Sequence, residues 1–440
     1  MKKQILFVAF LILLISCNDD DQDTNDNYKG YIYTSTNSSE GNGIIALGRK
    51  SNGKLSELPG SPYATGSLGD AAEGDFDTQG AIRIVGDYLL AVNAGNNPVN
   101  GSISVFKINK SDGSLSQVDQ NTSTPGMDNM DSYGIRASSI AAKDIGGSSW
   151  VVVSNQHSNP HYEMSPPITV GTVTSSPLRN VAVFTFDKSN GMLTYKNIGA
   201  TYNDGSNGGP TTIDFNHSGS KIAVSTWGVT HIMTPDPILE LQKPGRLYIY
   251  DFSDGTLTPT GTYEEVGISG NIGFSWSPNG KYIYASNFNL HSSKEDNSVT
   301  VLDGNTGAKL QNFESGNRND EACWTWVSNN KSKLYVVSFA ENVVSVFDIA
   351  ADNKLHKTLS PNYFTRAGNI PMGDSKDMYQ ADDYLYVSGA FQTHTLSVFK
   401  MSNSGALNEL SGSPYAVPSS IGKTKEQHAY LGLTGFEKKH

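Results

Sequence analysis

The sequence is poor in cysteine. Of its 440 residues only two are cysteines, Cys17 and Cys323. Cys17 lies in an N-terminal segment that we expect to be processed and modified, which leaves no second cysteine to form an intramolecular disulfide in the mature chain. Cys323 stands in the apolar stretch 322–326, where a buried, unreactive thiol is expected. Side-chain packing must therefore supply the stability of the fold.

The sequence also lacks an excess of positive charge and a long apolar run. Lys and Arg number 32 against 43 Asp and Glu, for a formal net charge of −11, which disfavours nucleic acid and anionic membrane surfaces as partners. The apolar run 5–15 is too short to cross a bilayer as a helix. Beyond the first twenty residues no convincing helical period appears, and the 44 glycines favour an all-β, turn-rich protein.

The N-terminus has the pattern of an export signal. Met1 is followed by two lysines, then by the apolar run 5–15, and then by Ser16 and Cys17. We interpret residues 1–16 as a signal peptide that is removed. The order of Leu14, an apolar residue, a small residue and Cys17 resembles the lipobox of bacterial lipoproteins. That resemblance implies that Cys17 is the lipidated first residue of the mature chain.

Residues 17–27 predict a disordered tether. After Cys17 the chain is almost entirely Asp, Asn, Gln and Thr, which is too polar and too acidic to pack. An acidic run directly after a lipid-bearing cysteine resembles the surface-export signal of lipoproteins in the Bacteroidota. We therefore expect an outer membrane lipoprotein exposed at the cell surface, with a periplasm-facing protein as the alternative. The lipid anchor would be its only contact with a membrane.

A short β-rich run recurs seven times in the rest of the chain. The ends of successive copies are 57, 62, 71, 61, 52 and 50 residues apart, a spacing typical of propeller blades. The seven copies are Tyr31–Ser35, Tyr88–Val92, Trp150–Ser154, Lys221–Ser225, Tyr282–Ser286, Leu334–Ser338 and Tyr384–Ser388. Each is followed by a loop and by a second run, such as 102–108, that is apolar on both faces, as expected where sheets stack face to face.

The turns and the ends of the chain complete the predicted architecture. Asn-Gly and Asp-Gly turns, such as those at Gly53 and Gly113, follow the second runs and indicate a third hairpin-linked run. A further run precedes most copies, which gives four strands in each repeat. The first repeat lacks it, whereas an extra run, Ala429–Phe436, ends the chain. Residues 28–440 therefore predict a seven-bladed β-propeller of four-stranded antiparallel blades, closed by the C-terminal strand in blade one.

Two features of the sequence resemble those of a known family. The stretch Gly101–Leu115 and the two copies of Ser-Pro-Tyr, at Ser61 and Ser413, resemble the lactonase-type seven-bladed propeller family, whose members include 6-phosphogluconolactonase and carboxymuconate cyclase. The resemblance spans about residues 28–440 and implies the same fold and a metal-independent lactonase. The sequence departs from the Pro-His-x-His stretch of many members at Gly209–Ile213 and Ser269–Ile272. No catalytic residue is therefore carried over from the family.

Aligning the repeats predicts a polar ring at the channel mouth, made by the residues that lead into the first strand of each blade. Its members are Gln79, Arg136, Thr211, Asn271, Glu321, Lys376 and His428. Arg136, Glu321 and His428 are the predicted catalytic residues, because an arginine neutralises an oxyanion, a carboxylate acts as a base, and a histidine transfers protons near neutral pH. Gln79, Asn271, Lys376 and His157 are predicted to bind substrate. Each of these residues is equally compatible with a water-satisfied lining of the channel.

Metal sites are a weaker interpretation of the same segments. His157, His161 and Glu163 have metal-binding residue types, but Pro160 forbids the helix on which such a spacing is useful. Several aspartates in the connections between blades, including Asp77 and Asp374, raise the possibility of calcium without a calcium-loop spacing. We predict no metal and no cofactor.

The sequence thus leaves two functional hypotheses. The first is an envelope-anchored propeller that hydrolyses a small lactone or sugar-derived substrate by acid/base chemistry at the channel mouth. The second is a noncatalytic lipoprotein that binds a glycan or a protein through the long loops of blades three to five, which contain His157, His161, His231 and His291. We expect a monomer under either hypothesis.

Overall fold

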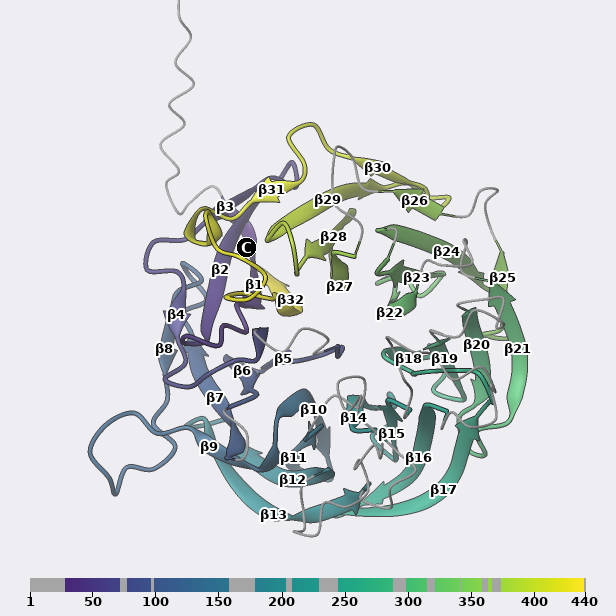
Figure 1. Ribbon diagram of the computed structural model, residues 1–440, viewed down its shortest axis with the longest axis horizontal. Coiled ribbons are helices and arrows are strands. Elements are labelled where there is room, and N and C mark those ends of the chain that lie inside the picture. Colours follow the sequence, from purple (N-terminus) through teal and green to yellow (C-terminus); the bar gives the residue numbers. More distant parts are fainter. Residues whose placement is uncertain are drawn as a thin grey trace, which may run out of the picture.

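Seven antiparallel sheets form a closed ring around a central channel (Figure 1). The computed structural model describes residues 28–71, 77–95, 99–157, 179–202, 208–228, 244–287, 298–314, 321–340, 342–357, 363–365 and 373–438. The predicted all-β, seven-bladed propeller is confirmed. The predicted signal peptide, Cys17 and the tether lie outside these residues. Among the helices of the described part, none has both the length and the apolar character needed to cross a membrane.

Each blade has four strands in radial order, from the channel outward. Blade 1 contains β32 (Leu431–Glu437), β1 (Tyr28–Ser35), β2 (Gly43–Lys50) and β3 (Leu55–Glu57), with β4 (Tyr63–Ala64) also on β2. Blade 2 contains β5 (Ile82–Val85), β6 (Tyr88–Asn93), β7 (Asn100–Ile108) and β8 (Leu115–Gln117), with β9 (Met130–Ile135) on β7. Blade 3 contains β10 (Ala137–Ile145), β11 (Ser148–Asn155), β12 (Asn180–Asp187) and β13 (Met192–Thr201).

The remaining blades follow the same order. Blade 4 contains β14 (Pro210–Phe215), β15 (Lys221–Thr226), β16 (Arg246–Ser253) and β17 (Thr256–Glu264). Blade 5 contains β18 (Phe274–Trp276), β19 (Tyr282–Asn287), β20 (Ser298–Asp303) and β21 (Lys309–Glu314). Blade 6 contains β22 (Ala322–Val327), β23 (Lys333–Ser338), β24 (Val343–Ile349) and β25 (Leu355–Lys357), with β26 (Tyr363–Thr365) on β24. Blade 7 contains β27 (Ser375–Ala381), β28 (Tyr384–Gly389), β29 (Thr395–Met401) and β30 (Leu407–Glu409), with β31 (Tyr415–Ala416) on β29. A 3-10 turn, η4 (Pro418–Ser420), leads toward the last strand.

The last strand of the chain closes the ring, as the sequence predicts. In Figure 1 the C-terminal β32 lies beside the N-terminal β1, with which it pairs antiparallel from Gly30 opposite Glu437 to Ser35 opposite Leu431. Gly432 sits where three blades meet: its N–H donates to Asp377 of blade 7 over 2.9 Å, and a Cβ there would lie 2.2 Å from Ile82 of blade 2. Its φ of +76° and this close approach both require glycine.

The repeated residues are explained by contacts between neighbouring blades. In blades 1 to 4 the glycine of the outer turn packs against an aromatic ring of the preceding blade, as Gly113 does against Tyr31 and Gly191 against Tyr88. In blades 1 and 7 the tyrosine two residues later in the second strand donates its hydroxyl to the same turn, as Tyr33 does to the Gly113 carbonyl over 2.8 Å. These repeated residues thus form contacts between neighbouring blades.

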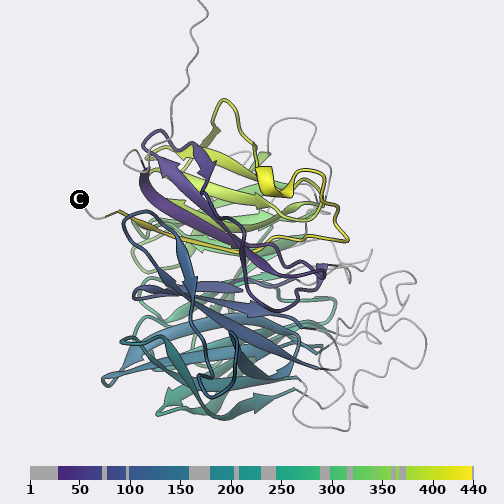
Figure 2. The same cartoon turned by 90° about the vertical axis from the view of Figure 1, so that its left-hand side faces the viewer.

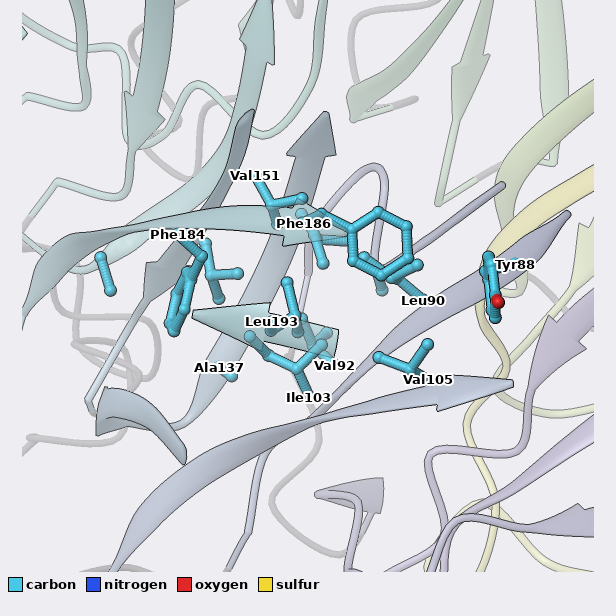
Figure 3. Close-up of a cluster of buried hydrophobic side chains, with 14 of the residues drawn as sticks. Tyr88, Leu90, Val92, Ile103, Val105, Ala137, Val151, Phe184, Phe186 and Leu193 are labelled. Carbon is cyan, nitrogen blue, oxygen red and sulfur yellow. The ribbon is translucent and has the colours of Figure 1, made fainter. Parts of the chain in front are cut away.

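Apolar side chains fill the space between the blades. Figure 3 shows the cluster between blades 2 and 3, where Leu90, Val92 and Val105 of blade 2 face Val151 and Phe184 of blade 3. All five are at most 3 % exposed. Cys323 lies in a similar cluster and is buried as predicted. Burial of this apolar area is the main stabilising contribution, because the described residues include no disulfide.

The ring has two ends, which differ in what they carry. In the side view of Figure 2 the strands run between these ends. We call the end that bears the connections leading into the first strand of each blade the upper end. The opposite end, which bears the turns between the first and second strands, is the lower end. The residues predicted from the connections into the first strands belong to the upper end.

Candidate functional site

An irregularity in the innermost strands fixes the position of the predicted catalytic residues. The pairing of the first and second strands shifts register near the upper end in blades 1, 3, 4, 6 and 7. Arg136 and Glu321 each stand two residues before the bulged residue of their strand, and both have positive φ, +60° and +52°. Gly209 in blade 4 and Tyr430 in blade 1 occupy the equivalent position, two residues before the bulged residue of their strand. By this register Thr211 lies two residues after the equivalent position and His428 two residues before it.

Residues 77–80, which we call the channel segment, leave blade 2 and cross the channel. The innermost strand of blade 2 pairs with β6 only from Ile82 onward. Before it, the Thr78 hydroxyl donates to the Thr211 carbonyl of blade 4, and the Thr78 carbonyl accepts from the Trp324 indole of blade 6 over 2.8 Å. The segment therefore lies between blades that are distant in the sequence.

Gln79 is the centre of this crossing. Its side-chain amide donates to the Phe274 carbonyl over 3.0 Å and accepts from the Thr325 backbone N–H over 2.9 Å. Its own N–H donates to the Thr212 hydroxyl over 2.9 Å, and its carbonyl accepts from the Ser139 hydroxyl over 2.6 Å. Gln79, predicted to bind substrate, thus joins four blades across the channel.

Lys376 is paired with the channel segment. Its ammonium lies 2.7 Å from an Asp77 carboxylate oxygen, and both side chains are at most 10 % exposed. The same ammonium lies 5.5 to 5.7 Å from the ring centres of Trp324, Phe339 and Phe391. This is a lysine held by a carboxylate and by three aromatic faces, each of which stabilises its positive charge.

A cluster of charged and polar side chains lies where blades 2, 3 and 4 meet at the upper end. The Arg136 guanidinium forms a buried ion pair with Asp70. The backbone around Arg136 is tied to the end of β11, because its carbonyl accepts from Gln156 N–H and the Ile135 carbonyl accepts from His157 N–H, both over 2.9 Å. We call Asp70, Arg136, Gln156, His157 and Arg179 the upper cluster.

The histidine of the upper cluster is held neutral. Burial, followed by the positive charges of Arg179 and Arg136, lowers the pKa of His157 to about 4. Its imidazole is therefore unprotonated at neutral pH and has a lone pair to accept a proton. His157 has a φ of +70° and Arg136 a φ of +60°. Two strained residues that are not glycine, side by side, are a signature of functional sites.

The fully buried Gln156 adds an unusual feature to the upper cluster. Neither its amide nitrogen nor its amide oxygen has a hydrogen-bond partner within the described ranges. Its side chain packs against the backbone at Gly209, where a Cβ would lie 2.4 Å from Gln156 Cγ. A buried amide without partners is costly, and a polar ligand group would satisfy it.

His428 belongs to a different group, at the seam between blades 7 and 1. Its carbonyl accepts from the His394 ring over 2.8 Å, and the two imidazoles meet edge to face with centres 5.9 Å apart. Burial, then His394 and Lys423, lowers the pKa of His428 to about 4. Its partners thus come from blade 7 and from the chain end, and they differ from those of Arg136.

Glu321 and Asn271 complete the predicted set. The Glu321 carbonyl accepts from Phe339 N–H over 3.0 Å in blade 6. Asn271 is fully buried, donates to the Asn287 side chain over 2.5 Å and accepts from the Thr211 hydroxyl over 2.8 Å at its carbonyl. No contact among the described residues joins Arg136, Glu321 and His428 to one another. Arg136 and His157 are the predicted site residues that the fold brings together.

Two other expectations concern metals and loops. The part of the chain with described coordinates holds no group of three or more His, Cys, Asp or Glu side chains suited to a metal ion. His161, Glu163, His231 and His291 lie outside that part. Asp70, Gln156 and Arg179 are not among the residues predicted from the sequence, which were taken from the connections into the first strands and from the histidines of the long loops. Gln156 and Arg179 bound the longest loop between second and third strands, 155–179, and that length was the available signal.

Comparisons with known proteins bear on the fold. No family model matches the chain, and no curated protein does. Among solved structures, a protein from Lactobacillus plantarum is similar with a TM-score of 0.63 and 15 % identity, over 93 % of this chain and 99 % of the other. A proposed 6-phosphogluconolactonase from Bacteroides fragilis gives a TM-score of 0.62 at 13 % identity, over 95 % and 100 %. The periplasmic gluconolactonase of Pseudomonas aeruginosa gives 0.60 at 13 %, over 93 % and 99 %.

The chain has a lactonase-like propeller fold. At such identities the likeness is one of fold alone, so it confirms the architecture that the sequence resemblance implies and leaves the activity to be argued from the site. For a lactonase-like propeller, the upper cluster is the place where chemistry is best supported.

Proposed function

We propose that this protein hydrolyses a small, sugar-derived lactone at the upper end of its channel. The observation that carries the proposal is the upper cluster, in which a neutral His157 stands beside the guanidiniums of Arg136 and Arg179. A proton acceptor next to fixed positive charge suits a reaction that develops an oxyanion and ends in a carboxylate. The fold shared with the periplasmic gluconolactonase of Pseudomonas aeruginosa supports the same substrate class.

The reaction assigns a role to each charged group. Water attacks the lactone carbonyl carbon and gives a proton to the His157 ring nitrogen. Arg136 and Arg179 stabilise the negative charge on the carbonyl oxygen, while Asp70 fixes the Arg136 guanidinium through its ion pair. The bond between the carbonyl carbon and the ring oxygen then breaks, and the proton passes from His157 to the leaving alkoxide. The Gln156 amide is positioned to bind a hydroxyl of the substrate.

The other predicted residues take supporting roles in this proposal. Glu321 and His428 lie at the upper end in other blades, and we propose them as the alternative catalytic residues, to be tested in the same assay. Gln79, Asn271 and Lys376 make buried contacts with Phe274, Asn287 and Asp77. We propose that these three shape the base of the upper site on which the substrate rests.

We also propose that the protein is anchored in the outer membrane through Cys17. Support comes from the lipobox-like sequence that ends at Cys17 and from the acidic run that follows it. Since an exported enzyme does not meet cytosolic phosphorylated sugars, a phosphate-free lactone is the proposed substrate. Membrane fractionation tests the anchor: the Cys17→Ser chain should leave the membrane fraction, and equal retention of both chains would contradict the proposal.

The activity is tested with the full-length protein in detergent against a panel of aldonolactones, with spontaneous hydrolysis subtracted. His157→Gln should lower kcat by about 10²- to 10⁴-fold, the range for loss of a general base. The matched control is His356→Gln, an exposed histidine on the outer strand β25. Because the lowered pKa of His157 keeps the ring neutral, kcat/KM should stay constant from pH 8 to pH 6 and fall as the pH approaches about 4.

Two outcomes would overturn the assignment. Hydrolysis that survives both His157→Gln and Arg136→Lys would exclude the upper cluster as the site, and loss of activity in Glu321→Gln or His428→Gln alone would move it to those blades. No turnover on the whole panel would favour the noncatalytic binding protein instead. Circular dichroism of each variant separates loss of activity from loss of fold.

A further inference from the structure

The lower end of the channel carries a cavity that the proposed reaction does not use. Its volume is about 400 Å³, and it is lined by the innermost strands of blades 2 to 6 and by their turns. Gln79, Ser275 and Thr325 form its inner wall, where the two hydroxyls lie 2.8 Å apart. None of the five upper-cluster residues lines the cavity. Its size suits one small-molecule ligand.

Positive charge gathers in this cavity. Arg83, Lys143, His217 and Lys331 line it, and Asp214 is its carboxylate among the described residues. The Arg83 guanidinium nitrogen Nη2 lies 3.4 Å from the Asp214 carboxylate oxygen Oδ2, and each of these two side chains is 32 % exposed. Neither Lys143 nor Lys331 forms an ion pair within the described part of the chain. In a protein with a net charge of −11, two such lysines beside Arg83 indicate a site for an anion.

His217, which also lines the cavity, lies near its positive charges. The pKa of His217 is lowered, first by burial and then by the positive charges of Lys331 and Lys143, with Asp214 acting in the opposite direction. Both lysines therefore lie close enough to His217 to act on it. An anion between them would meet all three groups.

Two tryptophans give the cavity flat apolar walls. The Trp276 indole N–H donates to the Asp214 carbonyl over 3.2 Å, which fixes the ring. The Trp326 ring meets Tyr379 edge to face at 5.7 Å. Its indole nitrogen is buried, and no acceptor for it exists among the described residues. A ligand oxygen would satisfy that donor, and indole faces are suited to the apolar face of a sugar ring.

We propose that the lower cavity binds an anionic monosaccharide, a single sugar unit that carries a carboxylate or a phosphate. Lys143, Lys331 and Arg83 hold the anionic group. The hydroxyls of Ser275 and Thr325, together with the free Trp326 donor, bind the sugar hydroxyls. The indole faces exclude water from the ring. This site does not depend on the proposed hydrolase, because none of the upper-cluster residues lines the cavity.

Binding is tested by titration calorimetry and by tryptophan fluorescence of the full-length protein. The probes are sodium gluconate, glucose 6-phosphate, neutral glucose and inorganic phosphate. We expect one of the two anionic sugars to bind at least tenfold more tightly than glucose and than inorganic phosphate; gluconate and glucose 6-phosphate distinguish a carboxylate from a phosphate. Affinity should fall as salt is added, because the attraction is electrostatic.

Variants locate the site. Lys143→Gln with Lys331→Gln should weaken the anionic sugar at least tenfold, whereas the matched double change Lys107→Gln with Lys196→Gln, on the exposed outer faces of β7 and β13, should leave it unchanged. Trp326→Phe should remove most of the fluorescence response. The proposal would be overturned if neither gluconate nor glucose 6-phosphate bound more tightly than glucose, or if inorganic phosphate bound as tightly as the tighter of the two anionic sugars. Binding that is lost in His157→Gln and retained in the lysine double variant would also overturn it, because the site would then lie at the upper end.

Discussion

The two ends of the channel differ in the burial and pairing of their cationic side chains. At the upper end the cations Arg136 and Lys376 are buried, and each is held by a buried carboxylate, Asp70 and Asp77. At the lower end the cations line an open cavity, and the one pair there, Arg83 with Asp214, is longer and partly exposed. Buried charge must be paired, whereas charge that faces water stays free for a ligand. The same innermost strands thus support a rigid polar network at one end and a charged cavity at the other.

Removing one carboxylate from each end gives the largest expected difference. Asp70→Ala should lower the free energy of unfolding by about 3–5 kcal/mol, because it leaves the buried Arg136 without its carboxylate. Asp214→Ala should lower it by no more than about 1 kcal/mol, because that pair is partly solvated. Equilibrium unfolding in urea measures both.

A double variant tests whether the instability of Asp70→Ala comes from the unpaired charge of Arg136. Asp70→Asn combined with Arg136→Met removes both charges, so the double variant should recover part of what Asp70→Ala loses. Similar losses for Asp70→Ala and Asp214→Ala would show that the two ends do not differ in this way.

The sequence predicts the repeated features well and the unrepeated ones poorly. The turn glycines, the aromatic residues of the second strands and the closing strand each follow from a local rule that recurs around the ring, so their places are correct. Gln79 was placed near the channel by alignment, but its bridge to Phe274 and Thr325 depends on a segment that leaves its own blade. No periodicity describes such a departure. Its role therefore required the three-dimensional structure.

The upper cluster and the lower cavity were likewise predictable from the sequence only in part. Arg136 and His157 were both singled out, yet the sequence did not pair them, because their contact is made through the backbone at Ile135 and Gln156. The lower cavity was missed altogether. Its signal was present: Arg83, Lys143 and Lys331 lie at the lower ends of first strands or in the turns after them. Basic residues in such turns are also common on solvated surfaces, so the sequence alone does not distinguish a binding site there.

Asp377 sharpens the rule that buried charge must be paired. It is buried near the upper end of β27 and accepts from Gly432 N–H over 2.9 Å, and burial raises its pKa to about 7. The folded chain therefore keeps this proton to a higher pH than the unfolded chain, whose carboxyl titrates near about 4. The contribution of Asp377 to stability is thus greatest below about pH 4 and falls as the pH rises to about 7.

Asp377→Asn retains an acceptor for Gly432 and removes the charge. The variant should be more stable than the wild type by roughly 2–4 kcal/mol at pH 8, with little difference at pH 4. Thermal and urea unfolding across this pH range measure the effect. The control is Asp87→Asn, an exposed aspartate whose ion pair with Lys110 is 4.0 Å long. A wild type whose stability rises between pH 4 and pH 7 relative to Asp377→Asn would contradict the expectation.

Gln79 tests whether the two ends are truly separate. Gln79→Ala removes the two side-chain hydrogen bonds to Phe274 and Thr325 and should lower the free energy of unfolding by about 1–3 kcal/mol, because it leaves a backbone donor and a backbone acceptor unsatisfied inside the channel. Gln117→Ala is the matched control: Gln117 donates to Thr65 and Asn129 over 3.0 Å at the rim of blade 2, where water replaces the lost amide. A smaller loss for Gln79→Ala than for Gln117→Ala would mean that water already fills the channel at Gln79. In that case water would connect the upper cluster with the lower cavity, and the two ends would not be independent sites.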